Sequence, residues 1–324
     1  MPREIARYLR LLIAALCLFP YFNTYARDYP SRTVTIVVPY GPGGAGDLTA
    51  RIFAQKMTQQ TTASVIILNR PGAGSVNSAT VVAHSKPDGY TVFLLGAGTA
   101  VSTQLFKNLP YKLSDFKHVS TIAFFDLVLL VDGKSQFKTV ADLIAYAKAH
   151  PGKTNIGTIA TGSTQNLAAD LFKSEAGIDM QVIPYDSTSQ VVTALRGNEL
   201  QAAFEIVPSV IGQIKSQSLR ALAVTAEKRF AGLPDVPTLD ECGLKGYEAT
   251  SWNGLSVPAD TPDAVVDALA KDVAAAVATP DVRKKLLDLG AEARSSTPAE
   301  MTQRLKNDQD KWKAVIDKAG IPHQ

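Results

Sequence analysis

Short apolar runs alternate with amphipathic runs along most of this 324-residue chain. A short apolar run is typical of a buried strand, and an amphipathic run of a helix with one apolar face. The first block has strand-like segments at Thr33–Pro39, Val65–Leu68 and Thr91–Leu95, with helical patterns near Asp47–Thr58 and Asn77–Ala83. This alternation predicts an α/β architecture with mainly parallel sheets.

A second block continues the alternation, and a loop rich in Pro, Gly and charged residues (232–250) separates it from a last strand-like segment, Trp252–Val257. The strands expected in this block are Leu127–Val131, Thr154–Gly157, Gln181–Pro184, Gln201–Glu205 and Leu219–Thr225, and the helices are Val140–Ala149, Gln165–Glu175, Gln190–Arg196 and Val210–Ser216.

The tail of the chain reads as helical. Three pairs place a capping hydroxyl before a proline suited to the first helical position: Thr261-Pro262, Thr279-Pro280 and Thr297-Pro298. Glu300 adds a capping box to the last of them. The first tail helix carries an apolar face at Val266, Leu269, Val273 and Val277.

About 298 residues follow the first 26, more than one core comfortably holds, so we expect two lobes. The helical tail has no sheet of its own and is expected to pack on the first block. The chain would then cross between the lobes twice, near Phe125–Leu127 and Thr250–Trp252. Residues 27–126 and 251–324 would form lobe 1, and residues 127–250 would form lobe 2. Two lobes joined in this way make a hinged clamp around a cleft.

Between Val34 and Asp47 (VTIVVPYGPGGAGD) a strand breaks into a glycine loop and then opens a helix. Such a loop directs backbone N–H groups toward one point beside the positive end of the helix dipole. The two following strands also run into glycine loops, Asn69–Ser75 and Gly96–Ala100. Because open α/β sheets bind ligands at the carboxyl ends of their strands, these loops predict a small-anion site.

Glycines 41, 43 and 46 also match the G-x-G-x-x-G pattern of dinucleotide-binding folds. A lone match is weak evidence. Asn69 and Arg70 stand where an acidic residue would hold the ribose, which suits only a phosphorylated cofactor, and Asp47 would place negative charge near a pyrophosphate. We therefore rank a small-anion site above a nucleotide site.

A second anion loop is expected within Ile156–Phe172 (IGTIATGSTQNLAADLF). A short strand ends at Gly157, several hydroxyls follow, and then a helix begins, so Ser163 or Thr164 would cap that helix. A plain capping role and a carboxylate cradle are the two interpretations. The cluster of hydroxyls with two glycines favours the cradle, since neutral donors hold an anion without the cost of burying Arg or Lys.

The first 26 residues follow the order of an export signal: three arginines, the apolar run Leu11–Phe22, and small residues around Ala26. The apolar run is too short to span a bilayer stably, and a buried N-terminal helix explains the order less well. Leu16 stands before Cys17 where a lipoprotein signal has Gly or Ala. We expect a soluble periplasmic protein that begins near Arg27.

Cleavage would reduce the formal charge from +3 to +1, which gives no electrostatic case for binding nucleic acid or membranes. Cys242, then the only cysteine, is interpreted as a buried apolar residue. The histidines at 84, 118, 150 and 323 lack metal-ligand spacing and are interpreted as surface residues. Without a G-x-S-x-G elbow or a supported S-x-x-K motif, we expect no metal, no cofactor and no enzyme activity.

Five segments, in order, resemble the periplasmic solute-binding proteins of tripartite tricarboxylate transporters, often called the Bug family. The resemblance covers essentially the whole mature chain. It implies a two-lobed α/β fold of the periplasmic binding protein, Venus-flytrap, type II-like kind. It also implies a small carboxylic acid as ligand and a membrane partner of two integral subunits. A sensor kinase is the alternative partner, and we expect the receptor to be a monomer. The segments are Tyr29–Arg51, Asn69–Ala79, Lys86–Leu94, Ala221–Pro262 and Pro280–Glu292.

By motif position, the resemblance implies that the second-lobe hydroxyl loop holds one carboxylate and the first-lobe glycine loop meets the other end of the ligand. The implied ligand-binding residues are Tyr40, Pro42, Gly43, Gly44, Asp47, Ala97 and Thr99 in the first lobe, and Ser163, Thr164, Gln165, Asp186 and Glu205 in the second.

Two positions depart from the family pattern. Asp186-Ser187 stands where the family usually has a basic residue and a glycine, and Asn166 where it has a histidine. An added carboxylate disfavours a tricarboxylate, so the hypothesis is a ligand with one or two carboxylates and an amino, amide or ring-nitrogen group near Asp186. An equal alternative is that Asp186 only caps the next helix.

Two other functions compete with a binding protein. An exported hydrolase or other enzyme could use the same cleft, although no base–nucleophile pair is evident. An NADP-binding oxidoreductase could use glycines 41–46, although soluble nicotinamide cofactors are scarce outside the cytoplasm. The aromatic side chains near strand ends either line the cleft for a ring-containing acid or belong to the core: Tyr40, Phe124, Phe125, Tyr185 and Trp252.

Overall fold

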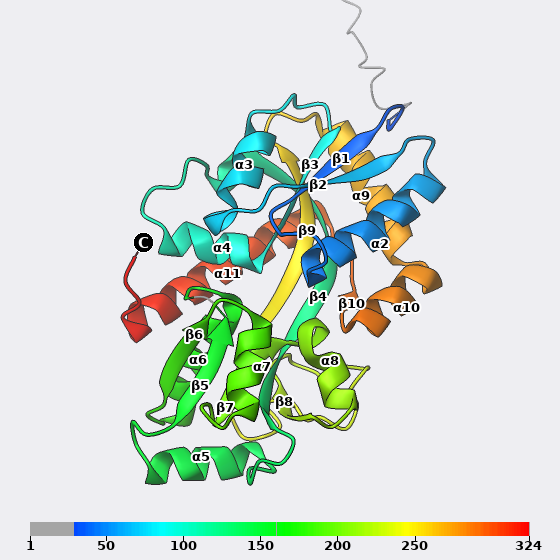
Figure 1. Cartoon of the computed structure of the whole chain (residues 1–324). Helices are drawn as coiled ribbons and strands as arrows, with labels where there is room; N and C mark the ends of the chain where they lie inside the picture. Colours follow the sequence, from blue (N-terminus) through cyan, green and yellow to red (C-terminus); the bar gives the residue numbers. More distant parts are fainter. Residues whose placement is uncertain (1–28, 160, 324) are drawn as a thin grey trace, which may run out of the picture.

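The computed structural model describes residues 29–159 and 161–323, so the expected export signal lies outside the described residues. Figure 1 shows two α/β lobes stacked one above the other, with long strands passing between them. The first lobe contains the N-terminal strands and the helical tail, and the second contains the middle of the chain. The two-lobed α/β fold expected from the sequence is confirmed.

The sheet of the first lobe begins with three parallel strands in the order β2-β1-β3: β1 (Val34–Val38), β2 (Val65–Asn69) and β3 (Thr91–Gly96). Next to β3 lies β9 (Thr250–Pro258), which is antiparallel to it, followed by β4 (Phe116–Asp132). The expectation of mainly parallel pairing therefore holds for β1–β3 and is wrong for the strands that join the lobes.

Strand β4 belongs to both lobes. As far as Asp126 it pairs with β9, and from Leu127 onward it pairs with β7 (Ala202–Ile206) and β8 (Leu219–Val224). Beyond β7 lie β5 (Asn155–Ile159) and β6 (Gln181–Tyr185), both in parallel pairing. Sequence patterning placed the start of this strand near Leu127 and missed its first part.

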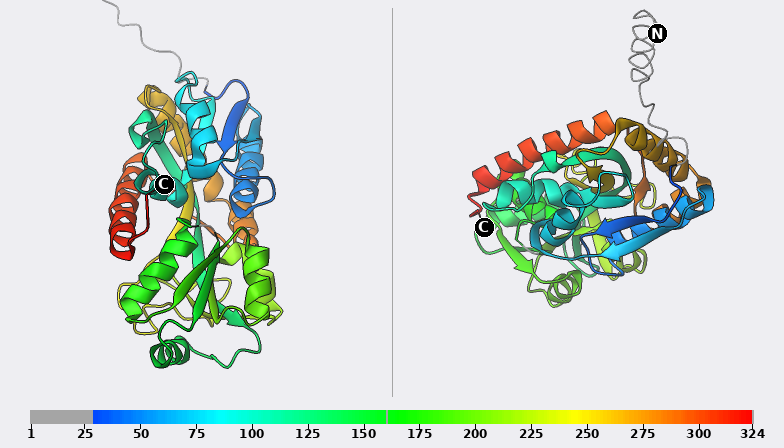
Figure 2. Two further views of the ribbon diagram at one scale, coloured as in Figure 1. Left: turned by 60° about the vertical axis from the view of Figure 1, so that its left-hand side comes forward. Right: turned by 90° about the horizontal axis from the view of Figure 1, so that it is seen from above.

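Helices lie on both sides of these sheets (Figure 2). A short strand, β10 (Glu292–Ala293), also pairs with β4. The first lobe has α2 (Ala45–Gln60), η2 (Ala73–Ser75), α3 (Val76–Ala83), α4 (Ala97–Leu105), η3 (Leu113–Asp115), α9 (Asp263–Val277), α10 (Pro280–Leu289) and α11 (Pro298–Ala319), and the second has α5 (Val140–Ala149), α6 (Thr164–Ala176), α7 (Thr188–Arg196) and α8 (Val207–Lys215).

The tail packs partly as expected. The apolar face of α9 is buried, and α9 packs against α2 and β4. Helix α11, however, packs against α6 of the second lobe as well as α4 and β4, because Trp312 and Ile316 share a core with Leu167 and Phe172. The tail is therefore a link between the lobes, in addition to being part of the first.

The three expected helix caps have different outcomes. Thr297 caps α11 and forms the capping box with Glu300. Thr279 precedes Pro280 as expected, but its hydroxyl donates to the carbonyl of Ala276 instead. The expectation for Thr261 is wrong: Pro262 occupies the cap position of α9, and Thr261 is buried two residues before the helix begins.

Helix α4 was not expected from the sequence, which reads there as a glycine loop. Gly96, the last residue of β3 and the N-cap of α4, lies so close to β9 that a Cβ atom on it would collide with the carbonyl oxygen of Trp252. The Trp252 indole N–H in turn donates to Asp308 of α11 at 2.6 Å. The glycine at 96 thus allows β3, β9 and α11 to come together beneath this loop.

We expect Gly96→Ala to lower the free energy of unfolding by at least about 2 kcal/mol, because backbone must shift to admit the methyl group. Gly98→Ala is the matched control, since no atom lies within 4 Å of the place that its new methyl group would occupy in the same helix. We expect this control to gain about 0.5–1 kcal/mol from reduced chain entropy. Urea unfolding of both variants checks the pair, and equal stabilities would contradict the packing described.

Candidate functional site

The glycine loop after β1 is held in place by the buried carboxylate of Asp47. One oxygen of Asp47 accepts from the Gly43 N–H at 2.8 Å and from Arg51 Nε at 2.9 Å. The other accepts from Asn69 Nδ2 at 2.8 Å, and that amide nitrogen also donates to the Tyr40 carbonyl at 2.9 Å. Asp47 and Asn69 therefore shape the loop from beneath, with hydrogen bonds at both of its ends.

Burial by itself would raise the pKa of Asp47, but the hydrogen bonds from Arg51, Asn69 and the Gly43 N–H lower the pKa overall. The carboxylate is thus ionised at neutral pH and compensated by its donors. Because both oxygens already accept hydrogen bonds from the protein, the contacts of Asp47 fit a positioning role. The side chain of Asn69, which stands where a dinucleotide-binding site would need an acidic residue, likewise forms its hydrogen bonds within the loop.

The three loops after β1, β2 and β3 are joined to one another. Asn69 links the first two, and the hydroxyls of Ser75 and Thr99 lie 3.5 Å apart between the second and the third. Ala97 and Thr99 are buried, whereas Pro42, Gly43 and Gly44 are exposed. The exposed backbone of the first loop is therefore the part of this lobe that is open to a ligand.

Tyr40 forms one wall of the same loop. Its ring packs against Gly46, where a Cβ atom would collide with it, and burial raises the pKa of Tyr40 to about 12. The other aromatic side chains considered for a cleft divide into two groups. Tyr185 is half-buried at the end of β6, whereas Phe124, Phe125 and Trp252 are core residues.

The hydroxyl loop of the second lobe is also built on internal hydrogen bonds. Ser163 caps α6: its hydroxyl accepts from the Asn166 N–H at 3.1 Å and donates to the Ile159 carbonyl at 2.9 Å. Asn166 accepts from the Gly162 N–H at 3.0 Å and donates to Thr158 at 3.3 Å. The hydroxyl of Ser163 is fully used as a cap, and Asn166 orders the loop.

Thr164 and Gln165 form the first turn of α6 and are both buried. The Thr164 hydroxyl donates to the side-chain amide oxygen of Gln165 at 3.0 Å. The side-chain amide nitrogen of Gln165 is then the donor group of the pair. The turn also offers the backbone N–H groups of a helix N-terminus, which favour an anion. These residues give the second lobe neutral donors at this position.

Glu205 lies near the end of β7, and Asp186 directly follows β6. Glu205 is fully buried, and its Oε2 accepts from the Thr188 hydroxyl at 3.1 Å. Asp186 is exposed, and its backbone N–H donates to Gln190 at 3.1 Å. The suggestion that Asp186 caps α7 is wrong, because the cap is the hydroxyl of Ser187, which accepts from the Gln190 N–H.

The hydroxyl loop of the second lobe contacts helix α4 of the first lobe. A Cβ atom on Gly162 would collide with Leu105 at the end of α4, and Leu105 shares a core with Leu167 of α6. Figure 1 shows the first turns of α6 and α7 at the top of the second lobe, toward the first. The hydroxyl loop is therefore next to the end of α4, on the face that turns toward the glycine loops.

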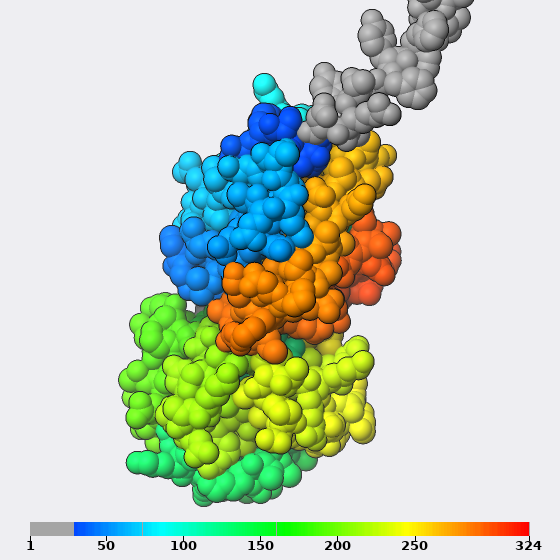
Figure 3. Space-filling view, turned by 90° about the vertical axis from the view of Figure 1, so that its right-hand side faces the viewer, coloured from blue at the N-terminus to red at the C-terminus, as the bar shows by residue number. Residues whose placement is uncertain are grey.

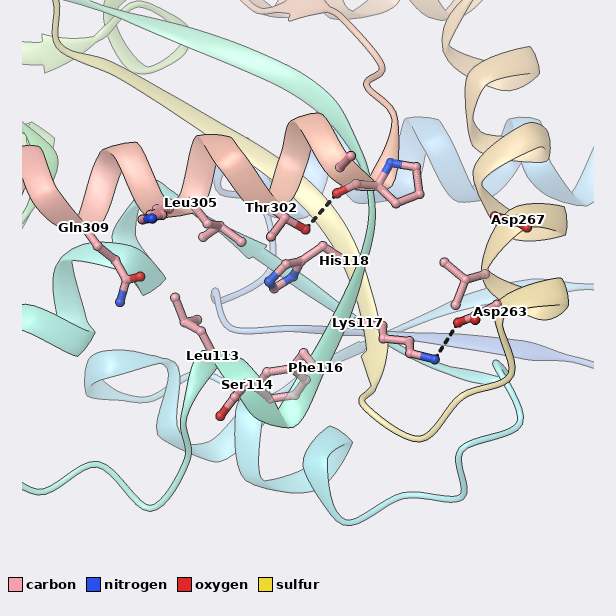
Figure 4. A pocket seen from close by; sticks show the side chains of 14 residues that line it. Leu113, Ser114, Phe116, Lys117, His118, Asp263, Asp267, Thr302, Leu305 and Gln309 are labelled. Carbon is pink, nitrogen blue, oxygen red and sulfur yellow. Dashed lines mark hydrogen bonds and ion pairs between the residues drawn. The ribbon is translucent and has the colours of Figure 1, made fainter.

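Two other hollows lie away from these loops. One is a groove of about 580 Å³ on the first lobe, lined by residues of β4, α9 and α11. In Figure 4 the groove holds His118 between α11 and the Lys117–Asp263 ion pair, whose atoms are 2.6 Å apart. His118 is half-buried, which corrects its interpretation as a surface residue, and burial lowers its pKa to about 4.

The other hollow, about 390 Å³, lies at the hinge between Asp126, the segment 226–231 and Arg294. On the side shown in Figure 3, the orange α10 lies above the yellow-green segments of the second lobe. Burial, together with repulsion from Glu292, raises the pKa of Asp126 to about 7. Neither hollow is lined by any of the ligand-binding residues expected from the sequence. The helix N-termini and the glycine backbone make the loops a better candidate for the ligand site than either hollow.

A family model described as the tripartite tricarboxylate transporter family receptor matches residues 49–321. This chain belongs to that receptor family. The receptors of the family are periplasmic and work with membrane transporter subunits. Protein BugT of Bordetella pertussis is 31% identical over 298 residues, which are 91% of each protein. The resemblance stated from the sequence is confirmed.

Two receptor structures resemble the chain along most of its length. Rpa4515 of R. palustris, solved with adipate, is 32% identical with a TM-score of 0.81 and covers 91% of this chain and 99% of its own. MatC of Rhodopseudomonas palustris, solved with bound malate, is 29% identical with a TM-score of 0.75 and covers 89% and 100%. Both ligands in those proteins are carboxylic acids.

Several further observations concern the described residues alone. Within residues 29–159 and 161–323, no three His, Cys, Asp or Glu side chains are grouped so as to hold a metal ion. None of the helices in that part of the receptor is both long and apolar enough to cross a membrane. Cys242 is half-buried, not fully buried as the sequence suggested, and burial raises its pKa.

We expect Asp47→Ala to lower the free energy of unfolding of the receptor by about 2–3 kcal/mol at pH 7, because it leaves the Gly43 N–H and the Asn69 amide without their acceptor. Since the pKa of Asp47 is lowered by folding, the wild type loses this stabilisation as the pH falls through that lowered pKa. The difference in the free energy of unfolding between the wild type and Asp47→Ala should therefore become smaller at acidic pH.

Urea unfolding at about pH 7 and about pH 3 measures this difference in stability. The two pH values lie on either side of the ordinary carboxyl pKa of about 4. Asp310→Ala is the control, since Asp310 is an exposed acid on α11. If Asp47→Ala and Asp310→Ala unfold at the same urea concentration at pH 7, the proposal that Asp47 positions and stabilises the glycine loop is wrong.

Proposed function

We propose that this receptor is a periplasmic solute-binding protein that captures a small mono- or dicarboxylic acid by closure of its two lobes. One carboxylate would be held at the first turn of α6, by Thr164, Gln165 and the backbone N–H of the cap Ser163. The other end of the ligand would meet the glycine loop, where Pro42, Gly43 and Gly44 are exposed. Tyr40, Asp47, Ala97 and Thr99 would support that loop, and Asp186 and Glu205 would complete the second-lobe side.

The observation that carries this proposal is the opposition of two built anion loops, each with its internal polar groups satisfied. Asp47 and Asn69 organise one loop, and Ser163 and Asn166 organise the other. Loops already held in shape lose little entropy when a ligand binds, which favours affinity. The adipate and malate bound by the two related structures support a carboxylate of this size.

We further propose the boundaries, along the chain, of the two lobes that move during closure. Lobe 1 would consist of residues 27–126 and 251–324, and lobe 2 of residues 127–250. The change of partners along β4 at Asp126 and the start of β9 at Thr250 support these limits. Closure would then bend the chain at these two crossings.

The receptor would be exported with removal of residues 1–26 and would act as a monomer without enzymatic activity. It would deliver its ligand to the membrane subunits of a tripartite tricarboxylate-type transporter or present it to a sensor kinase. The membership of the chain in a receptor family supports this arrangement.

We expect one class of carboxylic acid to raise the melting temperature of residues 27–324 by about 5 °C or more. A ligand at about a hundred times its Kd adds roughly 2.7 kcal/mol to the folded state. A thermal-shift panel of di- and tricarboxylates, acidic amino acids and ring acids tests this, with adipate and malate included. Gln165→Ala should lose most of the shift, whereas Gln303→Ala, on the exposed face of α11, should retain it. A flat response from folded, ligand-free protein would contradict the proposal.

The exposed carboxylate of Asp186 generates a separate expectation about ligand choice. If the ligand carries an amino, amide or ring-nitrogen donor at this end, Asp186→Ala should weaken binding of donor-bearing acids by roughly tenfold, about the contribution of one charged hydrogen bond. Simple dicarboxylates such as adipate should bind equally well or better. Calorimetry with glutamate and adipate measures the ranking, and Asp179→Ala serves as the control. An unchanged ranking would rule out this role for Asp186.

A further inference from the structure

The carboxyl group of Glu205 is a buried polar group of the second-lobe site whose hydrogen bonding is incomplete. Its side chain is fully buried at the end of β7, and Oε2 accepts one hydrogen bond, from Thr188. Among the described residues, Oε1 is buried and has no hydrogen-bond partner. Since a buried carboxylate is stable only when its oxygens are well supplied with donors, this group is poorly suited to remain ionised.

The surroundings place this carboxyl at the proposed ligand site. Thr188 is the first residue of α7, and Gln165, whose side chain also interacts with Glu205, is in the first turn of α6. The group therefore lies between the beginnings of the two helices whose N–H groups favour an anion. A carboxylate ligand at the first turn of α6 would come within reach of the free oxygen of Glu205.

The groups that hydrogen-bond to the Glu205 carboxyl are neutral. Burial raises its pKa to about 7, and the side chains of Thr188 and Gln165 and the Ile206 N–H only partly oppose that rise. None of the charged groups on the elements packed against β7 contributes to this shift. Those groups, with the titratable His118 included, are Lys117, His118, Asp126 and Asp132 on β4, Asp170, Lys173 and Glu175 on α6, Arg196 on α7, Lys215 on α8, and Asp186 before α7.

We propose that Glu205 is a specificity-determining residue that takes up one proton when the ligand binds and donates it, as an O–H···O⁻ hydrogen bond, to the ligand carboxylate. This proposal rests on the proposed function of the receptor. The step is balanced: one proton comes from solvent, Glu205 changes from carboxylate to carboxylic acid, and the ligand keeps its charge. No covalent bond of the ligand changes.

Electrostatic repulsion explains why ligand binding and proton uptake by Glu205 are coupled. Two ionised carboxylates in contact repel each other strongly, so a pair of this kind shares one proton. An O–H donor to a carboxylate makes a short and strong hydrogen bond. The site would therefore select an acid that remains ionised and would hold it through neutral donors, without an arginine or lysine. Affinity would be full below the pKa of Glu205 in the free protein and would decline above it.

Calorimetry of residues 27–324 with adipate and with malate tests this proposal between about pH 6.5 and 8.5, where free carboxylic acids are ionised. Each titration is repeated in two buffers of different ionisation enthalpy, which counts the protons taken up. For the wild type we expect uptake to approach one proton per ligand at the upper end, with Kd rising by up to about tenfold per pH unit.

Three variants assign the proton to its residue. Glu205→Gln keeps the size of the side chain and an N–H donor but cannot titrate, so its Kd should not change with pH in this window. Asp126→Asn is the first control, because Asp126 at the hinge is the other acid whose pKa is raised to about 7. Asp179→Asn is the second, as an exposed acid of the same lobe that is not among the proposed ligand-binding residues. Both controls should retain the pH dependence of the wild type.

A wild-type Kd that is independent of pH, or a pH dependence that Glu205→Gln retains, overturns the role of Glu205 and leaves the proposed function standing. Failure of the wild type to bind adipate, malate or any acid of the wider panel at every pH overturns the proposed function and, with it, this proposal. If Glu205→Gln does not fold, the proton count of the wild type and of Asp126→Asn still decides between the outcomes.

Discussion

Strand β4 is the element on which the rest of this receptor depends. Its side chains enter all four apolar cores: Phe124 and Phe125 pack on opposite sides of the first lobe, and Leu129 and Leu130 do so in the second. Buried backbone groups need partners, and β4 pairs first with β9 and then with β7 and β8, with register shifts at Val119, at Ile122 and after Leu129. One continuous strand therefore sets the distance and the direction between the two lobes, and with them the facing of the two anion loops.

Within that frame, the site is shaped by polar groups that act from beneath. Asp47 and Asn69 form hydrogen bonds with each other and with the backbone of the glycine loop. Ser163 and Asn166 form the corresponding hydrogen bonds in the hydroxyl loop. These buried networks are stable because each donor meets an acceptor. The surfaces left for a ligand are exposed glycine backbone on one side and a helix N-terminus on the other. Such neutral surfaces suit a small acid without an opposite charge, and the Glu205 carboxyl beside them has a buried oxygen that lacks a hydrogen-bond partner among the described residues.

The sequence predicts the parts of this fold that depend on local pattern. Parallel strands β1–β3, helices such as α6 and the Thr297 cap follow from periodicity and capping chemistry, and the family follows from motifs in order. The first part of β4 and helix α4 were missed, since His118 and Ser120 interrupt an apolar pattern and Gly96 and Gly98 resemble a loop. Both are set by contacts with β9 and α11, which are remote in sequence. The positioning roles of Asp47 and Asn69 were likewise hidden, because only the fold brings them together.

The central claim is that a small carboxylic acid binds between the glycine loop and the first turn of α6. A crystal structure of residues 27–324 with the acid that stabilises them most is its most direct test. We predict one ligand carboxylate at the Thr164–Gln165 turn and beside Glu205, with the other end against the Pro42–Gly44 backbone. A ligand bound instead in the hinge hollow beside Asp126, or in the groove around His118, would contradict this claim.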